Sequence, residues 1–187
     1  MIDEGFSSKN LMEPNRAGKG YAIWLMPEEP VYSELTGVIL SLSRECSMPA
    51  FEPHVTLLAG ITAPEHETVS LCAKLVSMPS SFEVQLTTID FLEEYYRSIF
   101  VRVAETDAIM LANGKAREVF GLRVEAPYLP HLSLLYGDVP LDVKKAIAAE
   151  LGSPFARSFQ ASSIHLYSVA GPVSRWRLVR TFDFALS

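Results

Sequence analysis

The sequence contains very few cysteines and no long apolar segment. Only two cysteines, Cys46 and Cys72, occur in 187 residues, and no C-x-x-C pair is present. Two thiols in a chain of this length do not make a disulfide scaffold, and no histidine follows them at the spacing of a zinc site. No stretch approaches the length of a transmembrane helix. We therefore expect reduced thiols, no bound metal or other cofactor, no membrane partner and a cytoplasmic location.

Basic residues are also scarce. The 16 lysines and arginines are outnumbered by 22 acidic residues, which gives a net charge of −6. Proteins that bind long nucleic acids neutralise many phosphates with clustered basic side chains, so this composition argues against such a partner. A small anionic ligand remains compatible with it, because local groups bind such a ligand. We expect a monomer with a flexible tail at residues 1–19, which lack the pattern of a signal peptide, and one domain at residues 20–187.

Apolar periodicity and turn residues divide the chain into alternating strands and helices. Hairpins among the strands favour antiparallel or mixed sheets, and the fold class is therefore α+β. Thr62 and Glu65 have the spacing of a capping box at the start of the second helix, and Lys144 and Lys145 are expected on an exposed helix face. The expected strands cover residues 20–27, 54–61, 82–92, 97–105, 159–169 and 175–185, with another starting at 131, and the expected helices cover 31–46, 63–78, 107–120 and 140–151.

One short phrase occurs twice. Residues 51–61 read FEPHVTLLAGI and residues 128–138 read YLPHLSLLYGD. Both copies contain an aromatic residue, a proline, a histidine, a small hydroxyl residue, two leucines and a glycine in the same order. The copies are too far apart for a solenoid repeat, and their separation is natural for a duplicated half-domain.

Each phrase supplies one imidazole and one hydroxyl to the same face of a strand. Side chains two residues apart share a face, so His54 lies beside Thr56 and His131 beside Ser133. A single motif of this kind is typical of a buried structural histidine, but a second matched copy favours a functional site. One imidazole can be neutral while the other is protonated, as general base and general acid catalysis requires, and the hydroxyls can bind phosphate oxygens. The sequence thus predicts acid–base chemistry on a phosphate.

These motifs, HVTL and HLSL, resemble those of the two-histidine phosphoesterase superfamily. Together with GYAIWLMP near the start, FEPHVTLL and APYLPHLSLLYGD are similar to the cyclic phosphodiesterases of plants and fungi. The resemblance implies two pseudo-symmetric lobes, each an antiparallel sheet flanked by helices, with a central cleft that carries both motifs. It also implies metal-free hydrolysis of ADP-ribose 1″,2″-cyclic phosphate to ADP-ribose 1″-phosphate, and of nucleoside 2′,3′-cyclic phosphates to nucleoside 2′-phosphates. The implied partner is this small cyclic phosphate substrate.

By the same resemblance the catalytic residues are His54, Thr56, His131 and Ser133, with His131 activating water and His54 protonating the leaving oxygen. Tyr136 matches a family tyrosine that faces the cleft, although strict strand alternation would turn it away unless a bulge intervenes. Trp24 is either a platform that stacks on the substrate's base or a core tryptophan.

Two other functions remain open at this point. One is an RNA-end or 2′,5′-linkage phosphodiesterase of the same superfamily, which the acidic composition disfavours. The other is a non-catalytic protein that binds nucleotides or RNA ends, which would have no need of a matched acid–base pair.

Overall fold

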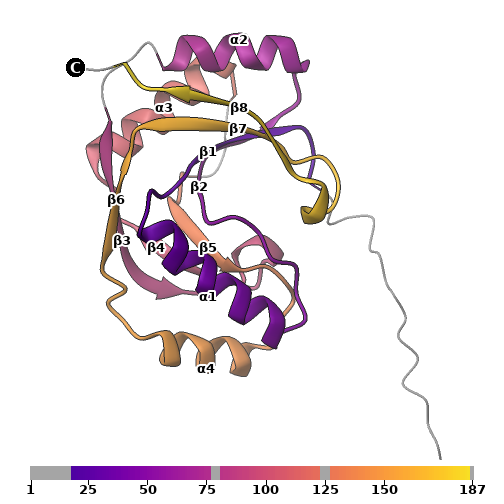
Figure 1. Cartoon of the computed structure of the whole chain (residues 1–187), viewed down its shortest axis with the longest axis vertical. Helices are drawn as coiled ribbons and strands as arrows, with labels where there is room; N and C mark the ends of the chain where they lie inside the picture. Colours follow the sequence, from indigo (N-terminus) through magenta and orange to yellow (C-terminus); the bar gives the residue numbers. More distant parts are fainter. Residues whose placement is uncertain (1–17, 77–80, 123–126, 186–187) are drawn as a thin grey trace, which may run out of the picture.

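The fold is an eight-stranded antiparallel sheet with four helices around it (Figure 1). The computed structural model describes residues 18–76, 81–122 and 127–185. The strand order is β6-β3-β4-β5-β2-β1-β7-β8. The elements are β1 (Tyr21–Leu25), α1 (Val31–Glu45), β2 (Val55–Ile61), α2 (Glu65–Leu75), β3 (Phe82–Asp90), the 3₁₀ turn η2 (Tyr95–Arg97), β4 (Ile99–Val103), α3 (Asp107–Phe120), β5 (His131–Leu135), α4 (Leu141–Leu151), β6 (Arg157–Ala161), β7 (Ser163–Ser168), the 3₁₀ turn η3 (Val173–Arg175) and β8 (Arg177–Asp183).

The sheet consists of two four-stranded halves that meet at the two phrase strands. β2 is the inner strand of the half β2-β1-β7-β8, and β5 is the inner strand of the half β5-β4-β3-β6. The only residues paired between β2 and β5 are Val55 and Leu132. Beyond this point the phrase strands diverge, and side chains bind the carbonyls of β2: Tyr128 Oη donates to Thr56 O at 2.9 Å and Asn113 Nδ2 to Leu57 O at 2.6 Å. This arrangement confirms the predicted α+β class with two pseudo-symmetric halves.

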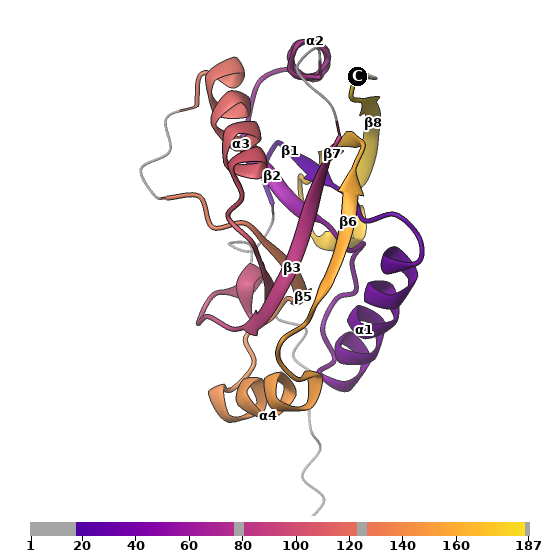
Figure 2. The ribbon, with the colours of Figure 1, turned by 90° about the vertical axis from the view of Figure 1, so that its left-hand side faces the viewer.

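Helices α1 and α3 connect the two halves. α1 follows a strand of one half but packs on β5 of the other, and α3 follows β4 but packs on β2. Figure 2 shows α2 and α3 near one end of the molecule and α4 at the opposite end. The buried face of α1 contains Val31, Leu35, Ile39 and Leu42, at the spacing of three or four residues that an amphipathic helix shows. Each phrase strand is therefore held by a helix that belongs to the other half in sequence.

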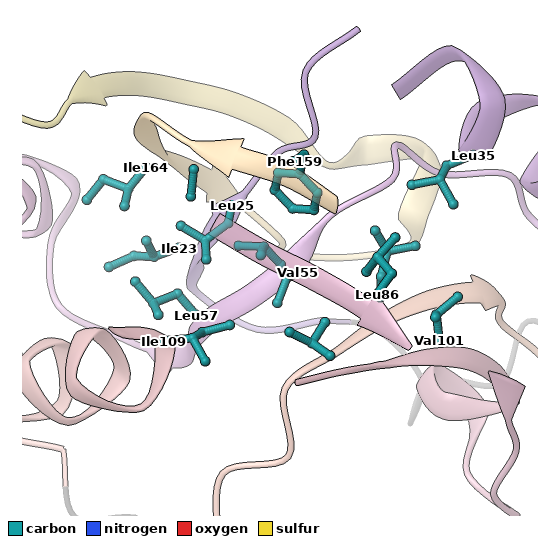
Figure 3. Close-up of a cluster of buried hydrophobic side chains, with 14 of the residues drawn as sticks. Ile23, Leu25, Leu35, Val55, Leu57, Leu86, Val101, Ile109, Phe159 and Ile164 are labelled. Carbon is teal, nitrogen blue, oxygen red and sulfur yellow. The ribbon is translucent and has the colours of Figure 1, made fainter. Parts of the chain in front are cut away.

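A single large core lies on the side of the phrase strands away from the histidines. Val55 and Leu57 alternate with His54 and Thr56, so the polar pair faces one side and the aliphatic pair the other. Figure 3 shows the core residues of β1 and β2 close to Leu86 of β3 and Val101 of β4. Burial of this cluster fixes the register of the strands, since a slip of one residue would turn the histidines into the core.

Two predictions about the elements were wrong. Residues 159–169 were expected to form one strand, but the chain breaks at Ser162 and places β6 and β7 in opposite halves of the sheet. The capping box is also absent: α2 begins at Glu65 after Pro64, and no side chain caps it. Glu65 is the first helical residue, not the third, and its carboxylate binds Tyr21 Oη and Arg177 instead.

The prediction that both lysines of α4 are exposed was correct for one of them and wrong for the other. Lys145 is exposed, whereas Lys144 is only 3% exposed and its Nζ donates to Leu92 O at 2.6 Å.

Most of the predicted tail, residues 1–17, lies outside the described residues, as do Ser77 and Met78 of the second predicted helix. Gly18 forms an isolated β-bridge with Gly171. None of the helices in the described ranges is both long and apolar enough to span a membrane.

Candidate active site

The two phrase histidines come together where β2 and β5 meet. His54 directly precedes β2, and His131 is the first residue of β5. Their neighbours Val55 and Leu132 are the paired residues of the junction. Both imidazoles line one pocket of about 420 Å³, which we call the histidine pocket. The predicted residues Trp24, Thr56, Ser133 and Tyr136 line it as well.

The same backbone contact orients both imidazoles. His54 Nδ1 lies 2.6 Å from Glu52 O, and His131 Nδ1 lies 2.8 Å from Leu129 O. A carbonyl oxygen can only accept a hydrogen bond, so each Nδ1 carries the proton. In the neutral ring Nε2 is then the bare nitrogen, able to accept a proton. The repeated proline stands between each histidine and the carbonyl that holds it, so the repeat in the sequence reproduces one imidazole geometry twice.

Burial lowers the pKa of both imidazoles, so neither ring is readily protonated in the free enzyme. Desolvation and, to a smaller extent, the nearby His131 lower the pKa of His54 from 6.5 to about 3, although the hydrogen bond to Glu52 O opposes the shift. Desolvation also lowers the pKa of His131, with a smaller contribution from Arg97. Both rings are therefore neutral at pH 7, and a proton must be taken up together with an anion that offsets it.

Tyr136 points into the pocket although strand alternation predicts the reverse. β5 ends at Leu135, so Tyr136 is no longer held to the alternation of the strand. Its hydroxyl lies 3.5 Å from His54 Nε2, and its ring stacks on Phe51 at 3.7 Å between centroids. Burial raises the Tyr136 pKa, so the hydroxyl stays protonated and can donate.

Trp24 is buried, and both of its faces are covered. Its ring stacks on His54 at 3.6 Å with an interplanar angle of 11°, and on Tyr167 at 3.8 Å. A base cannot stack on either face without displacing one of these rings. Of the two interpretations of Trp24, the geometry therefore disfavours the base platform and assigns Trp24 to the orientation of the His54 ring.

The hydroxyls of the two motifs differ in their surroundings. Ser133 Oγ donates to Tyr96 O at 2.8 Å and so connects β5 to η2. Thr56 is half-buried beside Trp24, its partner across the β1–β2 pair. A phosphate bound between the imidazoles would meet both hydroxyls, since all four side chains line one pocket.

Four further side chains of the pocket were not predicted from the sequence. Tyr96 and Arg97 belong to η2, Lys19 precedes β1, and Trp176 follows η3. Arg97 forms an ion pair with Glu94 at 2.6 Å. Trp176 lies about 6 Å from the rings of Tyr96 and Tyr136. None of the four belongs to a repeated motif; the only hint was the aromatic pair before Arg97 in the predicted hairpin.

No group of three or more His, Cys, Asp or Glu side chains in the described parts of the chain is arranged to hold a metal ion.

Comparison with known proteins agrees with this geometry. A family model described as cyclic phosphodiesterase-like protein matches residues 19–184. A cyclic phosphodiesterase of Arabidopsis thaliana is 29% identical over 129 residues, which cover 67% of this chain and 69% of that protein. A 2′,3′-cyclic-nucleotide 3′-phosphodiesterase of Yarrowia lipolytica is 22% identical over 215 residues, which cover 88% of this chain and all of that protein.

Among solved structures, E. coli LigT complexed with 3′-AMP is similar in fold. Its TM-score is 0.60 at 12% identity, with 90% of this chain and 99% of that chain covered. The chain thus belongs to the cyclic phosphodiesterase-like family of the two-histidine phosphoesterases, a family of enzymes that hydrolyse cyclic phosphodiesters.

Proposed function

We propose that the protein hydrolyses ADP-ribose 1″,2″-cyclic phosphate to ADP-ribose 1″-phosphate and nucleoside 2′,3′-cyclic phosphates to nucleoside 2′-phosphates, without a metal ion. The observation that carries this proposal is the matched pair of imidazoles in one pocket, each with Nδ1 held by a carbonyl and Nε2 left for proton transfer. The names of the family and of the curated relatives support the cyclic phosphodiester as substrate.

In the proposed reaction a water molecule attacks the phosphorus of the cyclic ester. Nε2 of His131 takes the proton of this water as the new P–O bond forms. The bond from phosphorus to the ribose 3′ oxygen breaks, and Nε2–H of His54 protonates that oxygen. The hydroxyls of Thr56 and Tyr136 donate to the non-bridging oxygens, where charge increases in the transition state, and Ser133 Oγ joins them when its single proton turns from Tyr96 O to the phosphate.

The surroundings of His54 support its role as the acid. The face of Trp24 against its ring attracts a cation through the quadrupole of the indole, which favours the imidazolium form. The negative phosphate adds a second attraction when it binds. Together these interactions oppose the desolvation that keeps His54 neutral otherwise.

Two basic side chains support substrates that carry a second anionic group. Lys19 and Arg97 line the histidine pocket, and a diphosphate such as that of ADP-ribose carries charge that they can bind.

We further propose that the protein acts as a cytoplasmic monomer, in which Cys46 and Cys72 remain the free thiols that the structure contains. Cell fractionation and the molar mass in solution test these two points.

The test is an assay with a substrate panel in the presence of EDTA. The purified protein receives each of the four nucleoside 2′,3′-cyclic phosphates and ADP-ribose 1″,2″-cyclic phosphate, and the products are identified. We expect turnover that excess chelator leaves unchanged, with nucleoside 2′-phosphates and ADP-ribose 1″-phosphate as products. Activity that chelation removes and a divalent ion restores would overturn the metal-free mechanism, and 3′-phosphate products would overturn the assigned leaving oxygen.

A further inference from the structure

A second pocket adjoins the histidine pocket. It has a volume of about 370 Å³, and it shares Trp24 and Trp176 with the histidine pocket. The size is within the range of small-molecule sites. We call it the Glu52 pocket, because Glu52 is the only charged residue among those that line it. Its walls are Trp24, Leu40, Ala50, Phe51, Glu52, Tyr167, Val173 and Trp176.

Half of the residues that line the Glu52 pocket are aromatic, and their neighbours hold them in place. Phe51 stacks on Tyr136 and Tyr167 stacks on Trp24, both at less than 4 Å between centroids. Trp176 Nε1 donates to Gly171 O at 3.2 Å. Leu40 is 42% exposed and adds an aliphatic surface. Such rigid walls suit a flat, weakly hydrated ring, because little side-chain entropy is lost when the ring binds.

The Glu52 carboxylate is fixed by one hydroxyl on each oxygen. Tyr167 Oη donates to Oε2 at 2.5 Å, and Tyr32 Oη lies 3.4 Å from Oε1. An ionised carboxylate has about four acceptor sites, so each oxygen can still accept another hydrogen bond. No lysine or arginine within the described residues forms an ion pair with Glu52, and the side chain is exposed. The pocket thus combines aromatic walls with an oriented pair of acceptors.

The chemistry that matches this pair is a planar heterocycle with two adjacent N–H donors. Guanine has N1–H beside the N2 amino group on its Watson–Crick edge. In adenine and cytosine an acceptor nitrogen stands next to the amino group, and in uracil a carbonyl stands on each side of N3–H. A carboxylate would repel these acceptors, so only guanine can be bound through both oxygens.

We propose that the Glu52 pocket binds the base of the substrate and that Glu52 makes the enzyme prefer guanosine 2′,3′-cyclic phosphate. This inference rests on the proposed function, since it assigns the base of the same substrate. The position of the pocket fits, because it shares Trp24 and Trp176 with the histidine pocket. Glu52 also connects the two sites directly: its carbonyl holds His54 Nδ1 while its carboxylate faces the neighbouring pocket.

The experiment compares kcat and KM for the four nucleoside 2′,3′-cyclic phosphates in the wild type and in Glu52→Gln. Glu150→Gln, an exposed acid on α4, is the matched control. Glutamine keeps the size of the side chain and the backbone carbonyl but replaces one acceptor with a donor. We expect the wild type to favour the guanosine substrate by about 10–100-fold in KM, the value of one bidentate contact to a base. Glu52→Gln should lose most of this preference, measured as the ratio of the guanosine to the uridine KM within each variant, and Glu150→Gln should retain the wild-type ratio.

A binding measurement separates this inference from the proposed function. The chain's only two tryptophans, Trp24 and Trp176, line both the Glu52 pocket and the histidine pocket, so their fluorescence reports nucleotide binding, and the comparison of guanine with uracil isolates the contribution of the base. Guanosine 2′-phosphate should bind at least 10-fold more tightly than uridine 2′-phosphate, and Glu52→Gln should reduce the difference. If no cyclic nucleotide is hydrolysed, the proposed function fails and this titration alone decides the inference. Equal affinity for the two products, or a guanine preference that persists in Glu52→Gln, overturns it.

Discussion

At the scale of single residues, the two imidazoles are predicted to work as one unit. His54→Ala and His131→Ala should each lower the turnover of a 2′,3′-cyclic nucleotide by about 10²–10⁴-fold, because each removes one proton transfer. The double variant should lose far less than the product of the two effects, since one missing partner already disables the concerted reaction. Single-turnover kinetics checks the rates, and circular dichroism should show an unchanged fold. A folded single variant with near-normal turnover would contradict the mechanism.

The buried state of the histidines predicts an acidic optimum for kcat/KM. The competent enzyme has one protonated and one neutral imidazole. Burial lowers the pKa of His54 to about 3 and that of His131 below 6.5, so both rings are neutral at pH 7 in the free enzyme and a singly protonated pair forms only as the pH falls. Above the higher pKa both rings are neutral and kcat/KM should fall as pH rises.

The pH profile of kcat provides the internal control. A bound phosphate anion raises the pKa of the imidazolium beside it, so the alkaline limb of kcat should lie at higher pH than that of kcat/KM. Initial rates between pH 4.5 and 9 would show both limbs. A kcat/KM that rises from pH 6.5 to 8 would contradict the neutral state that burial imposes on both rings.

The six predicted site residues line one pocket, and the local alternation of side chains along each strand explains the position of four of them. His54 with Thr56 and His131 with Ser133 are placed by strand alternation, which is visible in the sequence. Tyr136 could be placed only after the end of β5 was known. Arg97 and Trp176 reach the pocket from 3₁₀ turns, and such turns have no side-chain period from which a direction could be predicted.

At the scale of elements, the segment from Leu92 to the turn η2 is held in place by hydrogen bonds from outside it. Lys144 Nζ on α4 donates to Leu92 O, and Gly137 N–H donates to Tyr95 O at 2.9 Å. Ser133 Oγ adds the bond to Tyr96 O. These bonds fix the segment that brings Tyr96 and Arg97 to the histidine pocket.

Lys144→Met is therefore predicted to destabilise the protein and to loosen this segment. Methionine preserves most of the buried volume but leaves Leu92 O without its charged donor, which costs about 1–3 kcal/mol of unfolding free energy. Urea unfolding measures this loss, and KM for a cyclic nucleotide should rise as Tyr96 and Arg97 lose their fixed positions. Lys145→Met, on the exposed side of the same helix, should change neither quantity. Equal behaviour of the two variants would show that the contact is unimportant.

Most boundaries of the helices and strands were predictable from the sequence, but the pairing of the strands was not. α1 follows from its apolar stripe and α3 ends at Gly121, whose φ of 61° is in the left-handed region that glycine tolerates. The break at Ser162 could not be found, because this one residue separates β6 from β7 and neither glycine nor proline marks the break. Only the tertiary pairing, β6 with β3 and β7 with β1, separates them.

At the scale of the whole molecule, the site depends on the contact between two halves. The phrase strands share one paired position, while α1 and α3 cross from each half to the other. The imidazoles are buried because the halves are held together, since each half alone would expose its phrase strand. Global stability and the protonation of the histidines are therefore coupled.

This coupling predicts that acid destabilises the fold from pH 6.5 downwards. Burial lowers the native pKa of His54, His131 and His165, whereas each titrates near 6.5 in the unfolded chain. Below pH 6.5 the unfolded chain binds protons that the native state does not, so the free energy of unfolding falls, by up to about 1.4 kcal/mol per pH unit for each histidine.

Urea unfolding at pH 7.5, 6.5 and 5.5 should show little change over the first interval and a clear loss over the second. His54→Gln should show a smaller loss because it removes one of these groups, and His66→Gln, on the exposed face of α2, should follow the wild type. A wild-type stability that stays constant down to pH 5.5 would mean that the imidazoles are already accessible to protons in the native state.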